Sequence, residues 1–137
     1  MHLDPRTLAL INLAVQAFLV FAVFGAAYLA RRSGDFRKHC TVMRVAVPLQ
    51  IITIVFIMLP SLRDHIRHAQ PGSLNIEMLA HHVLGAAVVV LWIYINLVFL
   101  GLVKPLGRPI VAMRLALTSW VISLFMGIHI YFMIWVR

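Results

Sequence analysis

Two histidines in the apolar part of this chain are the residues whose chemistry most needs an explanation. His82 and His129 each lie inside a long run of residues that carry no charge. An imidazole surrounded by lipid is costly unless it finds a partner, such as another side chain, water, a metal ion or haem. The sequence therefore predicts that both rings are hydrogen-bonded or ligated.

The first interpretation is that His82 and His129 are the axial ligands of a b-type haem held between facing helices. Counted from the ends of their runs, the two imidazoles lie roughly 8 and 10 Å deep, which places them in one layer. Gly85 follows His82 by about one helical turn and would leave room for the macrocycle. The apolar wall of such a pocket would be completed by Ala86, Phe125 and Phe132.

Two other interpretations stay open. In one, a copper or zinc site near the outer surface uses a group of histidines, namely His65, His68, His81 and His82. In the other, the histidines bond to Asn12, Gln16 or water and hold the helices in register. His39, near the opposite membrane face, is a candidate for a second site.

These residues are carried by four apolar runs without Asp, Glu, Lys or Arg. The runs cover residues 7–30, 45–62, 78–103 and 115–136. Each run is long enough to cross a bilayer as a helix, and with 63% hydrophobic residues little of the chain is left for an aqueous domain. The first run is too long for a secretory signal and is interpreted as a retained helix. The prediction is an all-α integral membrane protein, in which residues 1–137 form a single domain and an up-down four-helix bundle with helices at about 7–30, 43–62, 76–103 and 111–136.

The distribution of basic residues predicts the orientation. Eight of them lie between the first and second runs or between the third and fourth, and four lie on the other side. The positive-inside rule then places both termini outside, in a multi-pass protein of the cytoplasmic (inner) membrane. The net charge of +8 is interpreted as this orientation signal with some attraction for anionic membrane lipid, and nucleic-acid binding is not expected.

The remaining polar residues are not predicted to bind a ligand. Interhelical hydrogen bonds are predicted for Gln50, Thr53, Asn96, Thr118, Ser119 and Ser123. The single cysteine, Cys40, is interpreted as a reduced loop thiol. The chain has no phosphate-binding glycine loop, no nucleophile triad pattern and no His-Glu-x-x-His motif. No catalytic residue is assigned, and we expect no independent catalytic activity.

Several local patterns resemble the small four-helix membrane proteins of the YozB/CtaM type. The matching features are His39 with Met43 four residues later, His82 early in the third run, and Trp120 with Gly127 seven residues later. The chain departs from that pattern in three places. A histidine expected in the loop before the last run falls near Pro109, and one expected early in the first run is replaced by an apolar residue. His129 is not part of the pattern.

The resemblance implies a role in maturation of haem-copper cytochrome c oxidases. A divergent member would be an accessory or maturation subunit that contacts larger membrane subunits of a respiratory redox complex. The residues themselves add haem b as the expected cofactor and copper as the weaker alternative. A b-type cytochrome that exchanges electrons with quinone and a non-redox scaffold subunit are the alternative functions.

Overall fold

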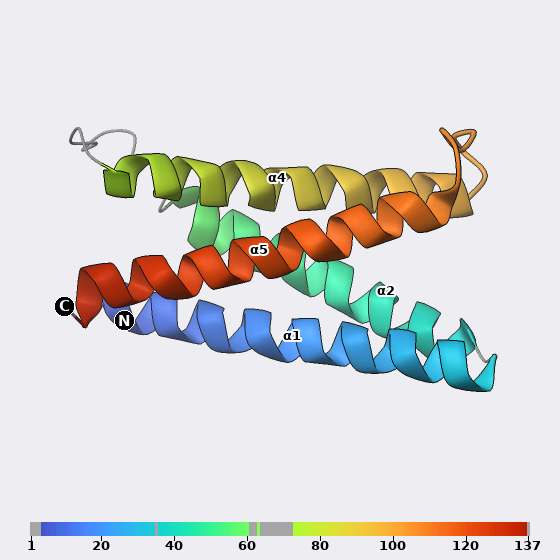
Figure 1. The fold of residues 1–137 in the computed structure, drawn as a ribbon, viewed down its shortest axis with the longest axis horizontal. Helices are drawn as coiled ribbons and strands as arrows, with labels where there is room; N and C mark the ends of the chain where they lie inside the picture. The colour runs from blue at the N-terminus through green and yellow to red at the C-terminus, as the bar shows by residue number, and fades with distance from the viewer. Residues whose placement is uncertain (1–3, 35, 61–62, 64–72, 137) are drawn as a thin grey trace. The chain divides into compact units, whose positions relative to one another are not determined.

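The computed structural model describes residues 4–34, 36–60, 63 and 73–136, and these residues form helices and connecting turns without a strand. The helical elements are α1 (Pro5–Ser33), α2 (Phe36–Thr53), the π-helix η1 (Ile54–Met58), α4 (Ser73–Phe99) and α5 (Pro109–Trp135) (Figure 1). Four helical segments are long and apolar enough to cross a membrane: Pro5–Ser33, Phe36–Met58, Asn75–Phe99 and Pro109–Trp135. The predicted all-α class with four such helices is therefore confirmed.

The helices divide between two compact units. The first contains α1, α2 and η1, and the second contains α4 and α5. Each unit is an antiparallel hairpin, as the course of the ribbon in Figure 1 shows. The assembly of the two hairpins into one bundle stays a prediction, as does the side of the membrane on which the termini lie.

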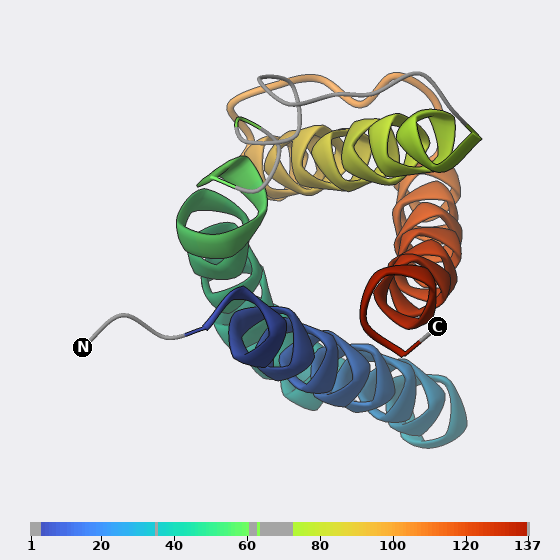
Figure 2. The ribbon, with the colours of Figure 1, turned by 90° about the vertical axis from the view of Figure 1, so that its left-hand side faces the viewer.

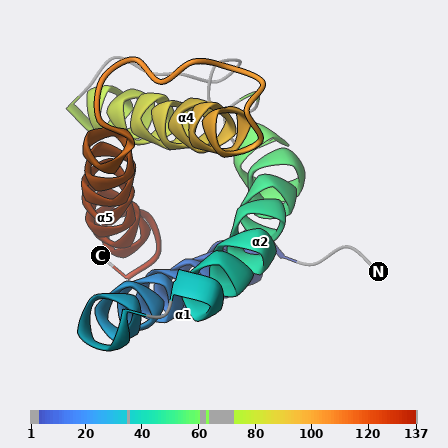
Figure 3. The same ribbon diagram turned by 90° about the vertical axis from the view of Figure 1, so that its right-hand side faces the viewer.

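The first hairpin turns at Gly34. This residue has a φ of 69°, which a glycine adopts without the steric penalty of a Cβ, and its N–H donates to the Ala30 carbonyl oxygen. Figure 3 shows α1 and α2 close together near this turn. The buried residues of α1 follow the i, i+3, i+4, i+7 spacing of one helix face: Gln16, Leu19, Val20, Val23, Ala26 and Ala30. The alanines among them allow close approach of helix backbones.

A π-helical stretch that the sequence did not predict ends the second of the four segments that are long and apolar enough to cross a membrane. The Leu59 N–H donates to the Ile54 carbonyl oxygen, a bond between residues five apart. Two nearby residues disturb the α-helical bonding pattern before this point. Pro48, inside α2, has no N–H to donate, and the Thr53 hydroxyl donates to the Gln50 carbonyl oxygen at 2.8 Å. We attribute the change of helix type to these two departures.

The ends of two helices differ from the sequence prediction. The second helix begins at Phe36, before the predicted start at about residue 43, because its exposed basic residues extend the helix beyond the apolar run. The third predicted helix ends at Phe99, before residue 103. Its end is set by Gly101, whose φ is 73° and whose N–H donates to the Val98 carbonyl oxygen, while the Leu102 N–H donates to that of Leu97. This pair of bonds is the Schellman arrangement that terminates helices.

The second hairpin packs through one face of each helix. On α4 the buried face is made of His82, Gly85, Val88 and Trp92. On α5 it is made of Ala116, Trp120, Ser123 and Ile130. The indole rings of Trp92 and Trp120 meet edge to face, with centroids 4.8 Å apart and an angle of 88° between their planes. This contact joins the C-terminal third of α4 to α5, and the two helices lie side by side in Figures 1 and 2.

Candidate functional site: a histidine cluster between α4 and α5

The second hairpin carries a group of polar side chains that we call the histidine cluster. Its members are Glu77, His81 and His82 on α4 and Ser123 and His129 on α5. Glu77 and His81 are four residues apart and therefore share one face of their helix. Every member has a hydrogen bond to a named oxygen or nitrogen, so the expectation that His82 and His129 need partners is confirmed.

His82 is the most deeply buried histidine of the cluster, with 6% of its surface exposed. Its Nδ1 lies 2.7 Å from the carbonyl oxygen of Met78, one turn earlier in α4. A carbonyl oxygen only accepts hydrogen bonds, so Nδ1 is the donor. In a neutral imidazole the hydrogen then sits on Nδ1, and Nε2 keeps its lone pair.

His81, the next residue, bonds to α5 instead. Its Nδ1 lies 2.9 Å from the backbone carbonyl oxygen of Ser123, and the Ser123 hydroxyl oxygen lies 3.2 Å from the same nitrogen. The Ser123 hydroxyl also lies 3.4 Å from the His81 carbonyl oxygen. The two helices are therefore tied at this level by side-chain and backbone polar groups. The interhelical bond predicted for Ser123 is confirmed.

Glu77 and His129 form a second tie nearer the end of the hairpin. The His129 Nδ1 donates to the Glu77 carboxylate oxygen Oε1 at 2.6 Å, and the two side chains are 59% and 25% exposed respectively. A short bond to a carboxylate is a strong one, and it again leaves Nε2 of the neutral ring with its lone pair. Glu77 directly precedes the third apolar run, which begins at residue 78. Its partnership with His129 depends on the register of α4 against α5, which no local pattern encodes.

That register also sets the relative depths of His82 and His129. Glu77 lies opposite His129, and His81 lies opposite Ser123. The positions of His82 and His129 along the hairpin axis therefore differ by about five to seven residues, or roughly 8 to 10 Å. Depth counted separately from the end of each run had predicted that both rings lie in one layer. The observed contacts place them about one and a half to two helical turns apart.

Of the other residues that were predicted to line the haem pocket, one is buried and three are exposed. Gly85 lies on the same buried face as His82 and about one turn away, as expected. Phe125 and Phe132 are 67% and 54% exposed, so they do not form the predicted inner wall with Gly85. Ala86 is exposed as well. These three residues lie on the outward faces of their helices. Residue spacing along one helix does not show which of its faces packs against a partner helix.

The four-histidine metal site is only partly within the described chain. His65 and His68 lie outside the described residues, and nothing tests their place in it. His81 and His82 are adjacent rings in edge-to-face contact, with centroids 5.4 Å apart. Among the described residues, no group of three or more His, Cys, Asp or Glu side chains is placed to hold one metal ion.

The polar residues of α1 belong to the other hairpin. Gln16 Nε2 donates to the Thr53 hydroxyl oxygen at 3.1 Å and lies 3.5 Å from Asn12 Oδ1. The interhelical bond predicted for Thr53 is confirmed. The side-chain oxygen Oε1 of Gln50 is buried without a hydrogen-bond partner in the described structure. The prediction that Asn12 and Gln16 bond to histidines remains a prediction.

Two further candidates lie elsewhere. His39 is half-buried near the start of α2, and its Nδ1 is buried without a described partner. Cys40 beside it is an exposed free thiol. Asn96, expected to bond between helices, instead donates to the Trp92 carbonyl oxygen of its own helix at 2.8 Å.

No protein-family model, curated protein or solved structure matches this chain.

Proposed function

We propose that this chain is an accessory or maturation subunit of a respiratory redox complex of the haem-copper oxidase type, and that it holds a b-type haem through His82 and His129. It would act as a multi-pass protein of the cytoplasmic membrane, against larger membrane subunits. The partner complex is proposed from the resemblance to the YozB/CtaM type. The observation that carries the haem proposal is the state of the two rings, since both have Nδ1 bonded to an oxygen acceptor.

The two imidazoles, with the oxygens that accept from their Nδ1 atoms, have the chemistry of ligands to a haem iron. A histidine that binds a metal through one ring nitrogen usually donates its other N–H to a carbonyl or carboxylate oxygen, which orients the ring and makes the ligating nitrogen more basic. Met78 supplies such a carbonyl to His82, and Glu77 supplies such a carboxylate to His129. The negative charge of Glu77 would also favour an electron-poor iron. A bound haem would supply one-electron transfer at this place.

The axial offset of roughly 8 to 10 Å is the demanding feature of this proposal, because both Nε2 atoms must reach one iron. The experiment is a reduced-minus-oxidised absorption spectrum of the purified protein from haem-replete cells. The expected result is a sharp α band that is lost in His82→Ala and in His129→Ala. His39→Ala, at the start of α2, is the matched control and should keep the band.

Two outcomes contradict the assignment of ligands. A band that survives His129→Ala but disappears in His81→Ala would replace His129 by its neighbour in the cluster. The absence of a band in the wild-type protein would remove the haem. If deletion of the gene lowers oxidase activity but the purified protein has no haem spectrum, the chain would be a maturation factor that binds no haem. If added quinol reduces a bound haem, the electron-carrier alternative would be favoured.

A structural subunit is the second candidate, and the interhelical bonds favour it specifically. His81 with Ser123 and Glu77 with His129 tie α4 to α5 without any guest. In that case the cluster stabilises the hairpin, as polar side chains do between membrane helices. His81→Ala would then lower the thermal unfolding temperature in detergent while no variant changes the visible spectrum.

A further inference from the structure

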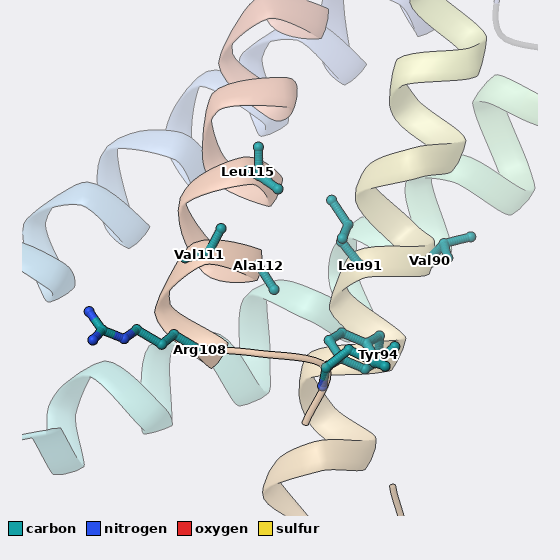
Figure 4. A pocket seen from close by; sticks show the side chains of 8 residues that line it. Val90, Leu91, Tyr94, Arg108, Val111, Ala112 and Leu115 are labelled. Carbon is teal, nitrogen blue, oxygen red and sulfur yellow. The ribbon is translucent and has the colours of Figure 1, made fainter. Parts of the chain in front are cut away.

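The opposite end of the second hairpin holds a groove that the proposed function does not use. It has a volume of about 380 Å³ and is lined by residues of α4, of α5 and of the loop between them. This volume is within the range of small-ligand sites, about 300–1,000 Å³. Figure 4 shows Leu91 on α4 and Ala112 on α5 at facing sides of the groove, with Tyr94 near its loop end. We propose that this groove binds one acyl chain of an anionic phospholipid whose phosphate contacts Arg108.

The walls of the groove fit a hydrocarbon chain. Apart from Tyr94 and Arg108, all its lining residues are aliphatic, with Leu91 and Leu115 among them. The groove reaches from the start of α5 at Pro109 to Leu115, six residues or roughly 9 Å along the helix. A chain lying there would run from the membrane surface towards the bilayer interior, in the direction that phospholipid chains take.

The loop end of the groove is held in place by Tyr94. Its hydroxyl oxygen accepts a hydrogen bond from the Leu106 N–H at 2.6 Å. Two residues later Arg108 precedes the helix, and its carbonyl oxygen accepts from the Val111 N–H at 2.9 Å. The guanidinium of Arg108 extends outward on the side away from Tyr94 (Figure 4). An arginine that lines an apolar groove with its stem and carries its charge outward is suited to a headgroup phosphate.

The charge at this end selects an anion. Lys104, Arg108 and Arg114 are all exposed, and the sequence contains no acidic residue after Glu77. The first turn of α5 adds the partial positive charge of a helix N-terminus. The basic residues also make this the side that the positive-inside rule predicts to be cytoplasmic, where anionic lipids are concentrated. A zwitterionic headgroup would gain less from the same site.

The test uses the full chain in phosphatidylcholine bilayers that contain a trace of spin-labelled phosphatidylglycerol or spin-labelled phosphatidylcholine. Electron paramagnetic resonance measures the motionally restricted fraction of each lipid, and hence their relative affinity for the protein. We expect a preference for phosphatidylglycerol that falls about fivefold in Arg108→Gln, the effect of one basic residue near an anionic headgroup. Arg114→Gln, exposed on the same helix but outside the groove, is the matched charge control and should change the preference less.

A second variant distinguishes lipid binding in the groove from attraction of the headgroup by the general surface charge. Ala112→Phe fills the groove without changing any charge, and it should remove the preference as well. Leu115→Phe, at an exposed groove position, serves the same purpose if Ala112→Phe does not fold. Retention of the preference in the folded filling variant, or equal effects of Arg108→Gln and Arg114→Gln, would overturn the proposal. Competition by excess inorganic phosphate would show a headgroup site that does not need an acyl chain, which also overturns it.

Discussion

At the scale of single residues, the hydrogen-bond partner of each imidazole decides what that imidazole can do. His82 and His81 are neighbours in sequence, yet one donates to a carbonyl oxygen of its own helix and the other bonds to α5. His129 donates to a carboxylate. When neutral, each of the three rings carries its hydrogen on Nδ1 and a lone pair on Nε2, which is the nitrogen available to a ligand.

The tautomer of His82 is a prediction at this scale. Because the Met78 carbonyl oxygen can only accept, His82 is expected to keep its hydrogen on Nδ1 and none on Nε2 when neutral. Nitrogen-15 NMR of histidine-labelled protein in detergent measures this directly, with His82→Gln used to assign the signal. A neutral His82 that carries hydrogen on Nε2 would mean that the bond to Met78 is absent.

At the scale of elements, a positive φ at Gly34 and at Gly101 marks the end of a helix, while a glycine inside a helix only weakens it. Gly101 has a φ of 73° and terminates α4, whereas Gly25 lies inside α1 with no positive φ. A Cβ at either position would meet nothing within 4 Å. The two sites therefore differ in backbone conformation rather than in available space.

Alanine substitutions at these two glycines should have opposite effects on stability. Gly101→Ala forces a left-handed conformation on a residue with a Cβ and should destabilise by about 1–2 kcal/mol. Gly25→Ala replaces a poor helix former by a good one and should stabilise by up to about 1 kcal/mol. Thermal unfolding in detergent, followed by circular dichroism, measures both. Equal shifts of the same sign would contradict the helix end at Gly101.

At the scale of the whole molecule, the predicted orientation follows from charge alone and has a direct test. The one cysteine, Cys40, is exposed on α2 and lies among the basic residues that the positive-inside rule places in the cytoplasm. A membrane-impermeant maleimide should therefore label it in inverted vesicles and leave it unlabelled in intact spheroplasts.

The matched control carries Asp4→Cys in a Cys40→Ala background. Asp4 is exposed and directly precedes α1, so its label should appear from the opposite side. Labelling of Cys40 in intact spheroplasts, together with protection of the cysteine at position 4, would reverse the topology. It would also place the groove at Arg108 on the outer side.

The amino-acid sequence by itself determined the helical class and the number of helices that are long and apolar enough to cross a membrane. Long uncharged runs have few alternatives in a bilayer, because every backbone polar group must be satisfied inside the segment. It also predicted that His82 and His129 have hydrogen-bond partners, since an imidazole in apolar surroundings is costly without one whatever the helix packs against. The third helix was predicted to end at about residue 103 and ends at Phe99, because hydropathy does not register the turn at Gly101.

Only the tertiary structure decided which residues meet. Glu77 bonds to His129 and His81 to Ser123 because of the register of α4 against α5, which depends on packing such as that of Trp92 on Trp120. Depth counted along one helix gives no information on this register, and so His82 and His129 were expected in one layer but differ in depth. The groove at Arg108 likewise arises from two helices and a loop together. Spacing along a chain describes one face of one helix, whereas a site is made where faces of different elements meet.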